Sequence, residues 1–305
     1  MNHVVWTQWS DVSAPKGITL LNPENAPFGS SEISATTFYV PPQMSGATGL
    51  AQVNNMPNLQ YLQMPNAGYE DALAYRREGL VICNAKGVHD VSTAELTIAL
   101  ITASLRGIDD FARAQATGQW LQERRPSLAF KRVGLIGYGS VGQTIARFLE
   151  PYRVDLVPFS KSGRDGSKTM DELDDLLPTF DVVILIVPAM AETTNLMDSK
   201  RLSLMKDGAL LVNMARGVVV DPDALLAELT SGRLKAAIDV MVQEPLPADN
   251  PLWRAPGVLI SPHVGGYSSA FEPSMKALLT KQFEQLVLGK EPHNIVAKGT
   301  EEIKR

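Results

Sequence analysis

The sequence predicts a two-domain α/β protein in which a doubly wound parallel sheet is inserted into a smaller α/β domain. Three observations lead to this fold class. The chain has 305 residues, which is longer than most single cores. Apolar runs alternate with helical patterns from residue 133 to residue 260, as strands and helices do in βαβ units. A glycine-rich turn directly follows the first of these runs.

Short apolar runs, separated by Pro-rich and Gly-rich turns, mark the amino-terminal part of the chain. They cover residues 4–6, 18–21, 36–40, 59–62 and 80–83. We expect residues 1–91 to form the smaller domain, which has a flavodoxin-like α/β fold. Residues 268–305, with a helical pattern over 269–288, are expected to complete it.

A long apolar helix is predicted over residues 94–117, after the capping-box-like sequence Ser92-Thr93-Ala94-Glu95. Its many Ala, Leu and Ile residues make it too apolar to lie fully exposed, so we expect a homodimer. Trp120, which follows this helix, is a candidate either for core packing or for contact with a second subunit.

The inserted domain, residues 92–267, contains the alternating pattern. Strands are expected at residues 133–136, 154–159, 182–187, 209–212, 236–238 and 258–260. Ligands of such a sheet bind at the carboxyl ends of its strands. The residues that follow these strands are therefore the first candidates for a functional site.

The first strand of the inserted domain runs into Gly137-Tyr138-Gly139-Ser140-Val141-Gly142, which has Gly-x-Gly-x-x-Gly spacing. The three glycines allow a tight turn, close approach of the backbone to a pyrophosphate, and packing of the next helix on the strand. That helix offers its first N–H groups to the phosphates. The motif predicts a Rossmann domain and assigns these six residues to a dinucleotide cofactor.

The residue that should recognise the adenosine ribose is not acidic. An Asp or Glu usually stands about 20 residues after such a turn and accepts from the 2′-hydroxyl of NAD. Here Ser160 occupies the position, followed by Lys161 and Arg164. A carboxylate would repel a 2′-phosphate, whereas these side chains can donate hydrogen bonds to it. We therefore predict that NADP(H) is preferred over NAD(H).

Three charged residues follow later apolar strands: Arg216 in Asn-Met-Ala-Arg-Gly, Glu244 in Val-Gln-Glu-Pro, and His263 in Ser-Pro-His-Val-Gly-Gly. Together with the stretch 218–225, these segments resemble the D-isomer-specific 2-hydroxyacid dehydrogenase family over roughly residues 60–295. Four motifs in the order of the family make the resemblance specific.

The resemblance implies hydride transfer between NADP(H) and a small 2-keto or 2-hydroxy acid. His263 would donate the proton, Glu244 would pair with its other ring nitrogen, and Arg216 would bind the substrate carboxylate. Asp239 would accept from the nicotinamide carboxamide. Further cofactor contacts are implied for Val187, Pro188, Met214, Ala215 and Arg216, and further substrate contacts for Asn66, Ala67 and Gly68.

The resemblance favours a D-specific reductase of glyoxylate or hydroxypyruvate, acting in a cleft between the two domains. A phosphoglycerate dehydrogenase-like enzyme remains an alternative, because residues up to about Gln52 match poorly and leave the substrate open. The family also includes corepressors, so a non-catalytic dinucleotide-sensing module is a second alternative. Turnover without any added protein would separate an enzyme from a sensor.

Composition narrows the partners and the compartment. The formal charge is −5 and the basic residues are scattered, so we expect no nucleic-acid partner. The apolar runs are too short to span a membrane, no charged and apolar leader opens the chain, and no metal is implied. Cys83 is the single cysteine and lies in an apolar run, which predicts a buried structural thiol. We expect a cytoplasmic protein.

Overall fold

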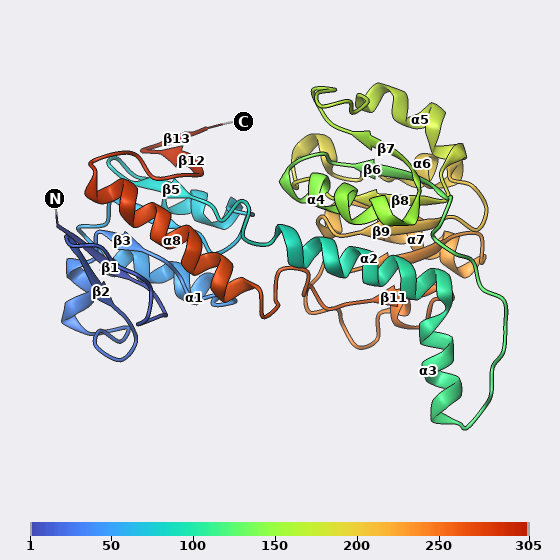
Figure 1. The fold of residues 1–305 in the computed structure, drawn as a ribbon, viewed down its shortest axis with the longest axis horizontal. Coiled ribbons are helices and arrows are strands. Elements are labelled where there is room, and N and C mark those ends of the chain that lie inside the picture. Colours follow the sequence, from blue (N-terminus) through green and yellow to red (C-terminus); the bar gives the residue numbers. More distant parts are fainter. Residues whose placement is uncertain (1, 304–305) are drawn as a thin grey trace. The chain divides into compact units, whose positions relative to one another are not determined.

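The computed structural model describes residues 2–303 and divides them into two units. Unit 1 consists of residues 2–89 and 269–303, and unit 2 consists of residues 90–268. Each unit contains one β-sheet with helices beside it (Figure 1).

The sheet of unit 1 has a flavodoxin-like parallel core. Its parallel strands run in the order β2 (Ile18–Leu21), β1 (His3–Trp6), β3 (Phe38–Tyr39), β4 (Tyr61–Gln63) and β5 (Val81–Cys83). Two antiparallel strands, β12 (Ile295–Lys298) and β13 (Glu301–Glu302), extend the sheet beyond β5. The sequence pattern did not predict these two strands.

Both faces of this sheet are covered. Tyr39 and Leu62 pack with Met56 in one buried cluster, near the short helix α1 (Gly46–Ala51). On the other face, Phe38 packs against Phe283 of α8 (Phe271–Val287). Alternate residues of a strand point to opposite faces, which explains why neighbours in sequence enter different clusters. The thiol of Cys83 is fully buried, as the sequence predicted.

The sheet of unit 2 is entirely parallel, and the predicted doubly wound fold is confirmed. Its order is β11 (Val258–Ile260), β10 (Lys235–Ile238), β9 (Leu210–Asn213), β8 (Val182–Leu185), β6 (Arg132–Ile136) and β7 (Asp155–Phe159). Strand β8 ends two residues earlier than predicted. The chain order reverses beside β6, because β7 lies on one side of it and β8 on the other.

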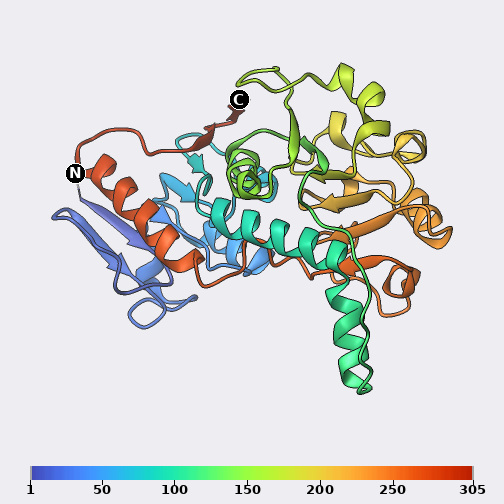
Figure 2. The same cartoon turned by 45° about the vertical axis from the view of Figure 1, so that its right-hand side comes forward.

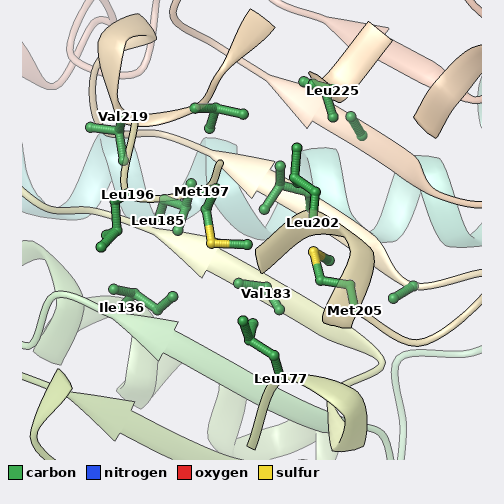
Figure 3. Packing of buried hydrophobic residues seen from close by; sticks show 14 of the residues in the cluster. Ile136, Leu177, Val183, Leu185, Leu196, Met197, Leu202, Met205, Val219 and Leu225 are labelled. Atoms are coloured by element: carbon green, nitrogen blue, oxygen red, sulfur yellow. The ribbon is translucent and has the colours of Figure 1, made fainter. Parts of the chain in front are cut away.

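Helices bury both faces of the unit 2 sheet. One face packs on α2 (Asp90–Arg106) and α4 (Ser140–Leu149). The other face packs on the short α5 (Leu173–Leu176), α6 (Ser199–Leu204) and α7 (Pro222–Thr230). Figure 3 shows Val183 of β8 near Met205, which follows α6, and Leu185 of β8 near Leu196 and Met197. Strands buried on both faces read as continuous apolar runs, which is why they were predictable.

The single helix predicted over residues 94–117 is wrong. Helix α2 begins at Asp90, and Gly107 separates it from α3 (Ile108–Ala116). The two helices are bent by 66°. Gly107 has a φ of +64°, a left-handed conformation that glycine adopts at no steric cost and that ends a helix. Ser92 is buried inside the first turns of α2 and does not cap it.

The apolar face of α2 does not require a second subunit. Its buried residues pack against α4 and the sheet within unit 2; they include Ala94, Leu100, Ile101 and Leu105. The expectation that this apolar helix needs a second subunit to cover it is therefore wrong. This packing does not test whether the protein is a dimer. Among the described residues no single helix is long and apolar enough to cross a membrane; α2 and α3 pass only as a bent pair.

Helix α3 and the chain that returns from it form an arm on unit 2, residues 108–131 (Figures 1 and 2). The guanidinium of Arg125 lies 5.6 Å from the ring centre of Phe111 and pairs with Asp110 at 3.1 Å. These contacts fasten the returning chain to α3. Trp120 in this arm is 90% exposed, so packing in the core of unit 2 does not explain it.

Candidate active site

Arg216, Glu244 and His263 gather at one edge of the unit 2 sheet. They follow β9, β10 and β11, which are neighbours in the sheet. Parallel strands bring their carboxyl ends to the same edge, so three separate loops meet there. Gly217 shows how closely they approach, because a Cβ at this position would lie 2.0 Å from the carbonyl carbon of Met241.

The carboxylate of Glu244 holds the ring of His263. Oε2 lies 2.6 Å from Nδ1 of His263, and Oε1 accepts the N–H of Met241 at 2.8 Å. An ionised carboxylate can only accept, so Nδ1 carries the proton of this bond. The other ring nitrogen, Nε2, is left for chemistry. Both side chains are partly open to solvent, at 45% for His263 and 36% for Glu244.

Asp239 organises the backbone around His263. Its buried carboxylate accepts the hydroxyl of Ser261 at 2.6 Å, the N–H of Val264 at 3.0 Å and the N–H of Gly265 at 2.9 Å. Its carbonyl oxygen accepts the N–H of His263 at 2.7 Å. Each carboxylate oxygen can accept two hydrogen bonds, and within residues 2–303 Oδ2 accepts only that of Gly265. It can therefore accept a second donor, such as the carboxamide of the nicotinamide that the sequence predicts as its partner.

Arg216 is held at its backbone by the buried side chain of Asn213. The amide of Asn213 donates to the carbonyl of Arg216 at 3.1 Å and accepts the N–H of Ala215 at 3.0 Å. The guanidinium donates to the carbonyl of Ala215 at 2.7 Å, so it lies folded back on its own loop. A single bond to a neighbouring carbonyl leaves most of its donors for an anion.

The glycine turn fits a pyrophosphate. Gly137 has a φ of +109°, and a Cβ there would lie 2.4 Å from the carbonyl oxygen of Ile186. At Gly142 a Cβ would lie 2.1 Å from the carbonyl oxygen of Gly137. These two glycines are required by the protein itself. At Gly139, by contrast, a Cβ would meet nothing within 4 Å, so that glycine keeps open a space at the start of α4.

Other residues assigned to the cofactor belong to this turn or follow the strands β8 and β9 of the same sheet. Val187 follows β8 and would lie 3.2 Å from a Cβ at Gly137. The carbonyl of Pro188 accepts the hydroxyl of Thr193 at 2.7 Å. Met214 and Ala215, which follow β9, are buried at 5% and 2% exposure. Tyr138 and Val141 are partly buried against the cluster that contains α4, and Ser140 donates its hydroxyl to Asp90.

The loop after β7 is compact and points its two cations outward. Ser160 accepts the N–H of Gly163 at 3.0 Å, and its hydroxyl lies 2.7 Å from that of Ser167. Ser167 donates to the carbonyl of Arg164, so the proton between the two hydroxyls belongs to Ser160. This hydroxyl is therefore already committed and shapes the loop, which the sequence analysis did not foresee. Lys161 and Arg164 are both exposed.

Lys161 is paired with an acid that the sequence analysis missed. Its ammonium lies 2.7 Å from Oε1 of Glu192, which belongs to the turn after β8. The two residues are 31 positions apart, so no local pattern could reveal the pair. The available signal was topological, because β7 and β8 both flank β6.

The predicted carboxylate turn lies in unit 1, after β4. Asn84 donates to the carbonyl of Ala67 at 2.8 Å, and Ala85 donates to that of Asn66 at 2.9 Å. Within the described part of the chain, the N–H groups of Asn66, Ala67 and Gly68 donate to no other protein group. The turn is thus fixed through its carbonyls while its donors stay open, which suits an anion.

Comparison with known proteins gives the family. The sequence profile described as D-isomer specific 2-hydroxyacid dehydrogenase, NAD binding domain, matches residues 98–265. A glyoxylate reductase from Thermofilum pendens is 32% identical over 257 residues, covering 79% of this chain and 76% of that protein. A glyoxylate/hydroxypyruvate reductase B from Citrobacter koseri is 30% identical, covering 81% of this chain and 80% of that protein.

Two further matches set the limits of the likeness. A D-3-phosphoglycerate dehydrogenase from Methanocaldococcus jannaschii is 28% identical, over 74% of this chain but only 45% of that protein. The crystal structure of a D-isomer specific 2-hydroxyacid dehydrogenase family protein from Aeromonas salmonicida has a TM-score of 0.85 and 23% identity, and covers 97% of this chain and 99% of that one. The fold is thus shared over nearly the whole chain, and the motifs and the sequence match agree with it. The chain belongs to the D-isomer specific 2-hydroxyacid dehydrogenase family and is an oxidoreductase.

Proposed function

We propose that this enzyme is an NADP(H)-preferring, D-specific reductase of glyoxylate or hydroxypyruvate. Two relatives that are matched over 76% and 80% of their length carry these substrates in their names, whereas the phosphoglycerate dehydrogenase is matched over 45% of its length. The catalytic residues act on a carbonyl group and a neighbouring carboxylate of the substrate. A two- or three-carbon keto acid provides both groups.

The observation that carries this proposal is the arrangement around His263. Glu244 fixes the tautomer and orientation of the ring from one side, and Asp239 fixes the loop that bears it. A proton donor that is positioned in this way is worth about 10²–10⁴ in rate. Asp239 and Glu244 both follow β10, so neither is part of the strand itself. Their placement is best explained by catalysis.

Each residue then has one task in the reduction. The bound cofactor supplies the hydride. Nε2 of His263 donates a proton to the carbonyl oxygen of the substrate, and the adjacent carboxylate stabilises the charged ring before transfer. Arg216 turns from the carbonyl of Ala215 to the substrate carboxylate, which it binds with two N–H groups. In the oxidative direction neutral His263 accepts the proton.

The cofactor preference rests on the loop after β7. The position that would hold an acid for NAD holds Ser160, and two exposed cations, Lys161 and Arg164, stand beside it. A 2′-phosphate carries close to two negative charges near pH 7, so it is the group that such a loop attracts.

Initial rates test the proposal directly. With glyoxylate or hydroxypyruvate, we expect NADPH to be oxidised faster than NADH. We also expect NADPH to be oxidised more slowly with pyruvate, 2-ketobutyrate and bulkier keto acids than with glyoxylate or hydroxypyruvate. The product should have the D configuration where it is chiral. Turnover on phosphohydroxypyruvate alone would contradict the substrate, and tight NADPH binding without turnover on any acid would contradict the activity.

We also propose that the enzyme is a homodimer in the cytoplasm. The arm of residues 108–131 exposes three large apolar side chains, Ile108, Trp120 and Phe130, at 52%, 90% and 75%, and exposed side chains of this kind are typical of an interface. The groove along the arm is lined by Phe111, Ala114 and Leu121 among other residues. A single buried thiol suits a reducing compartment, and cell fractionation would test the location.

A further inference from the structure

Residues 84–89 follow β5, the strand beside β4, and they hold the turn after β4 through three successive carbonyl groups. The carbonyl of Pro65 accepts a hydrogen bond from Nε2 of His89 at 2.9 Å. The next two carbonyls, of Asn66 and Ala67, accept from the start of the same segment at 2.9 Å and 2.8 Å. One stretch of chain therefore holds the carbonyl side of the turn.

Each of these carbonyls shares a peptide plane with one of the open N–H groups. The plane that contains the carbonyl of Pro65 also contains the N–H of Asn66, and the next two planes end at the N–H groups of Ala67 and Gly68. These peptide bonds are trans, so each N–H points away from its carbonyl. Binding the three carbonyls from one side therefore directs the three N–H groups to the opposite side. There, within residues 2–303, they donate to no protein group.

The ring of His89 is fixed by packing as well as by its hydrogen bond. It stacks on the ring of Phe271, the first residue of α8, with 5.3 Å between the ring centres and 5° between the planes. Both side chains are buried in unit 1. A carbonyl can only accept, so Nε2 carries the proton of the bond to Pro65. His89 therefore holds a donor at a fixed position beside the turn.

Packing on Phe271 does not by itself require a histidine at position 89. An apolar ring would cover Phe271 without the cost of burying a polar side chain. The imidazole adds polar nitrogens, and one of them, Nε2, binds the carbonyl that opens the turn. The residue type at position 89 is thus best explained by the turn.

We propose that His89 and Asn84 are positioning residues for the carboxylate of the substrate. Their side chains fix the peptide planes that end at the N–H groups of Asn66 and Gly68, and so direct these donors at the anion. Neither side chain contacts the substrate itself in this scheme. The inference rests on the proposed reduction of a small keto acid, and on the substrate contact that the sequence predicts for this turn.

Substrate kinetics test the role of His89. His89→Phe keeps a ring against Phe271 and removes the donor to Pro65. We expect KM for the keto acid that the unmodified enzyme reduces fastest to rise about three- to tenfold, because one N–H donor to the carboxylate is misaligned. Loss of such binding raises KM without lowering kcat, so kcat should change by less than about twofold. Kd for NADPH should not change, because the glycine turn belongs to unit 2.

Two further variants separate this role from a purely structural one. His89→Gln retains an N–H donor in its side chain, and KM should return to within about twofold of that of the unmodified enzyme. Asn84→Leu removes the donor to Ala67 and should also raise KM about three- to tenfold. Because Asn84 is only half-buried, this variant should keep the Tm of the unmodified protein, and it tests the proposal even if His89→Phe does not fold.

A second buried histidine of unit 1 provides the matched control. His3 is 5% exposed and lies against the ring of Tyr61, at the amino ends of the parallel strands and so at the edge opposite to the turn. His3→Phe should leave KM unchanged, whatever its effect on Tm.

The outcomes distinguish this inference from the proposed function. An unchanged KM in His89→Phe or in Asn84→Leu would overturn it, and so would an equal rise of KM in His89→Gln or in His3→Phe. If the unmodified enzyme reduces no keto acid at all, the proposed function is wrong instead.

Discussion

His263 has a backbone conformation that the surrounding residues must enforce. Its φ of +54° lies in the left-handed region, which costs a residue with a Cβ about 1–2 kcal/mol. The carbonyl of Asp239 accepts the N–H of His263, and the carboxylate of Asp239 accepts the next two N–H groups, so one side chain and its own carbonyl hold three successive residues. A strained residue that is held so thoroughly is typical of a functional position.

Replacing His263 with Ala should therefore remove turnover and spare the cofactor. We expect kcat for glyoxylate to fall by about 10²–10⁴, because the proton must then come from water. Kd for NADPH, measured by fluorescence, should change by less than about twofold, because the glycine turn is untouched. His293→Ala is the control, since that side chain is exposed in unit 1. An unchanged kcat would exclude His263 as the proton donor.

Residue types and their positions after strands could be predicted, but their partners could not. Glu244 and His263 stand 19 positions apart, and only the resemblance to a family suggested that they meet. The expected contact of Asp239 with the cofactor stays a prediction, and the sequence did not reveal that the same carboxylate holds Ser261, Val264 and Gly265. Such contacts depend on the order of strands in the sheet, which no short segment of sequence contains.

At the scale of elements, strands were easier to predict than helix ends. The parallel strands of unit 2 are buried on both faces and so form apolar runs. Gly107 was overlooked because a single glycine interrupts an apolar pattern without changing its period. Strands β12 and β13 were missed because only their pairing defines them, β12 with β5 and β13 with β12, and β13 has only two residues.

The glycine turn allows function and stability to be separated. In Gly139→Ala the new Cβ meets no protein atom, so we expect an unchanged Tm and at least tenfold weaker NADPH binding, because the Cβ fills the space of the pyrophosphate. In Gly142→Ala the Cβ would lie 2.1 Å from the carbonyl oxygen of Gly137, so Tm should fall by several degrees. Thermal unfolding and fluorescence titration measure the two effects. Equal NADPH affinity in Gly139→Ala would contradict the assigned role.

Asp174 connects two helices and makes their contact depend on pH. It lies in α5 and bonds Lys200 at 2.8 Å and Arg201 at 2.7 Å, both in α6. The hydrogen bond from Lys200, followed by that from Arg201, lowers the pKa of Asp174 below its ordinary value of 3.8. The folded state therefore binds this proton less readily than the unfolded state. Its contribution is complete well above pH 3.8 and is lost as the pH falls through the lowered pKa.

Asp174→Asn should accordingly lower Tm by about 1–3 °C at pH 7, and the difference should shrink steadily as the pH is lowered toward 3. Scanning calorimetry over a pH series measures this. The exposed neighbour Asp175 offers the control Asp175→Asn, which should leave Tm unchanged. A difference that persists unchanged at low pH would mean that packing, and not the charge of Asp174, connects α5 to α6.

At the scale of the whole molecule, helices already cover both faces of the unit 2 sheet. We therefore expect an interface with a second subunit to form at a part of unit 2 that projects from this packing. The arm of residues 108–131 does so, and its charged contacts, such as Arg125 with Asp110, lie within the arm itself. Among its exposed side chains are three large apolar ones, Ile108, Trp120 and Phe130. Trp120 is 90% exposed, which is unusual for the most amphipathic of the large side chains.

We therefore expect sedimentation at micromolar concentration to give twice the mass of the chain, and Trp120→Glu to shift the protein to the mass of one chain. A charge in the centre of an apolar interface costs several kcal/mol, so the dimer should weaken by about 10² or more. Leu288→Glu is the matched control, because Leu288 is 64% exposed after α8 in unit 1. Circular dichroism should show both variants folded, since neither side chain is buried. A monomeric unmodified protein would contradict the dimer. A Trp120→Glu variant that stays dimeric would show that the arm lies outside the interface, and the exposed tryptophan would then need another partner to explain it.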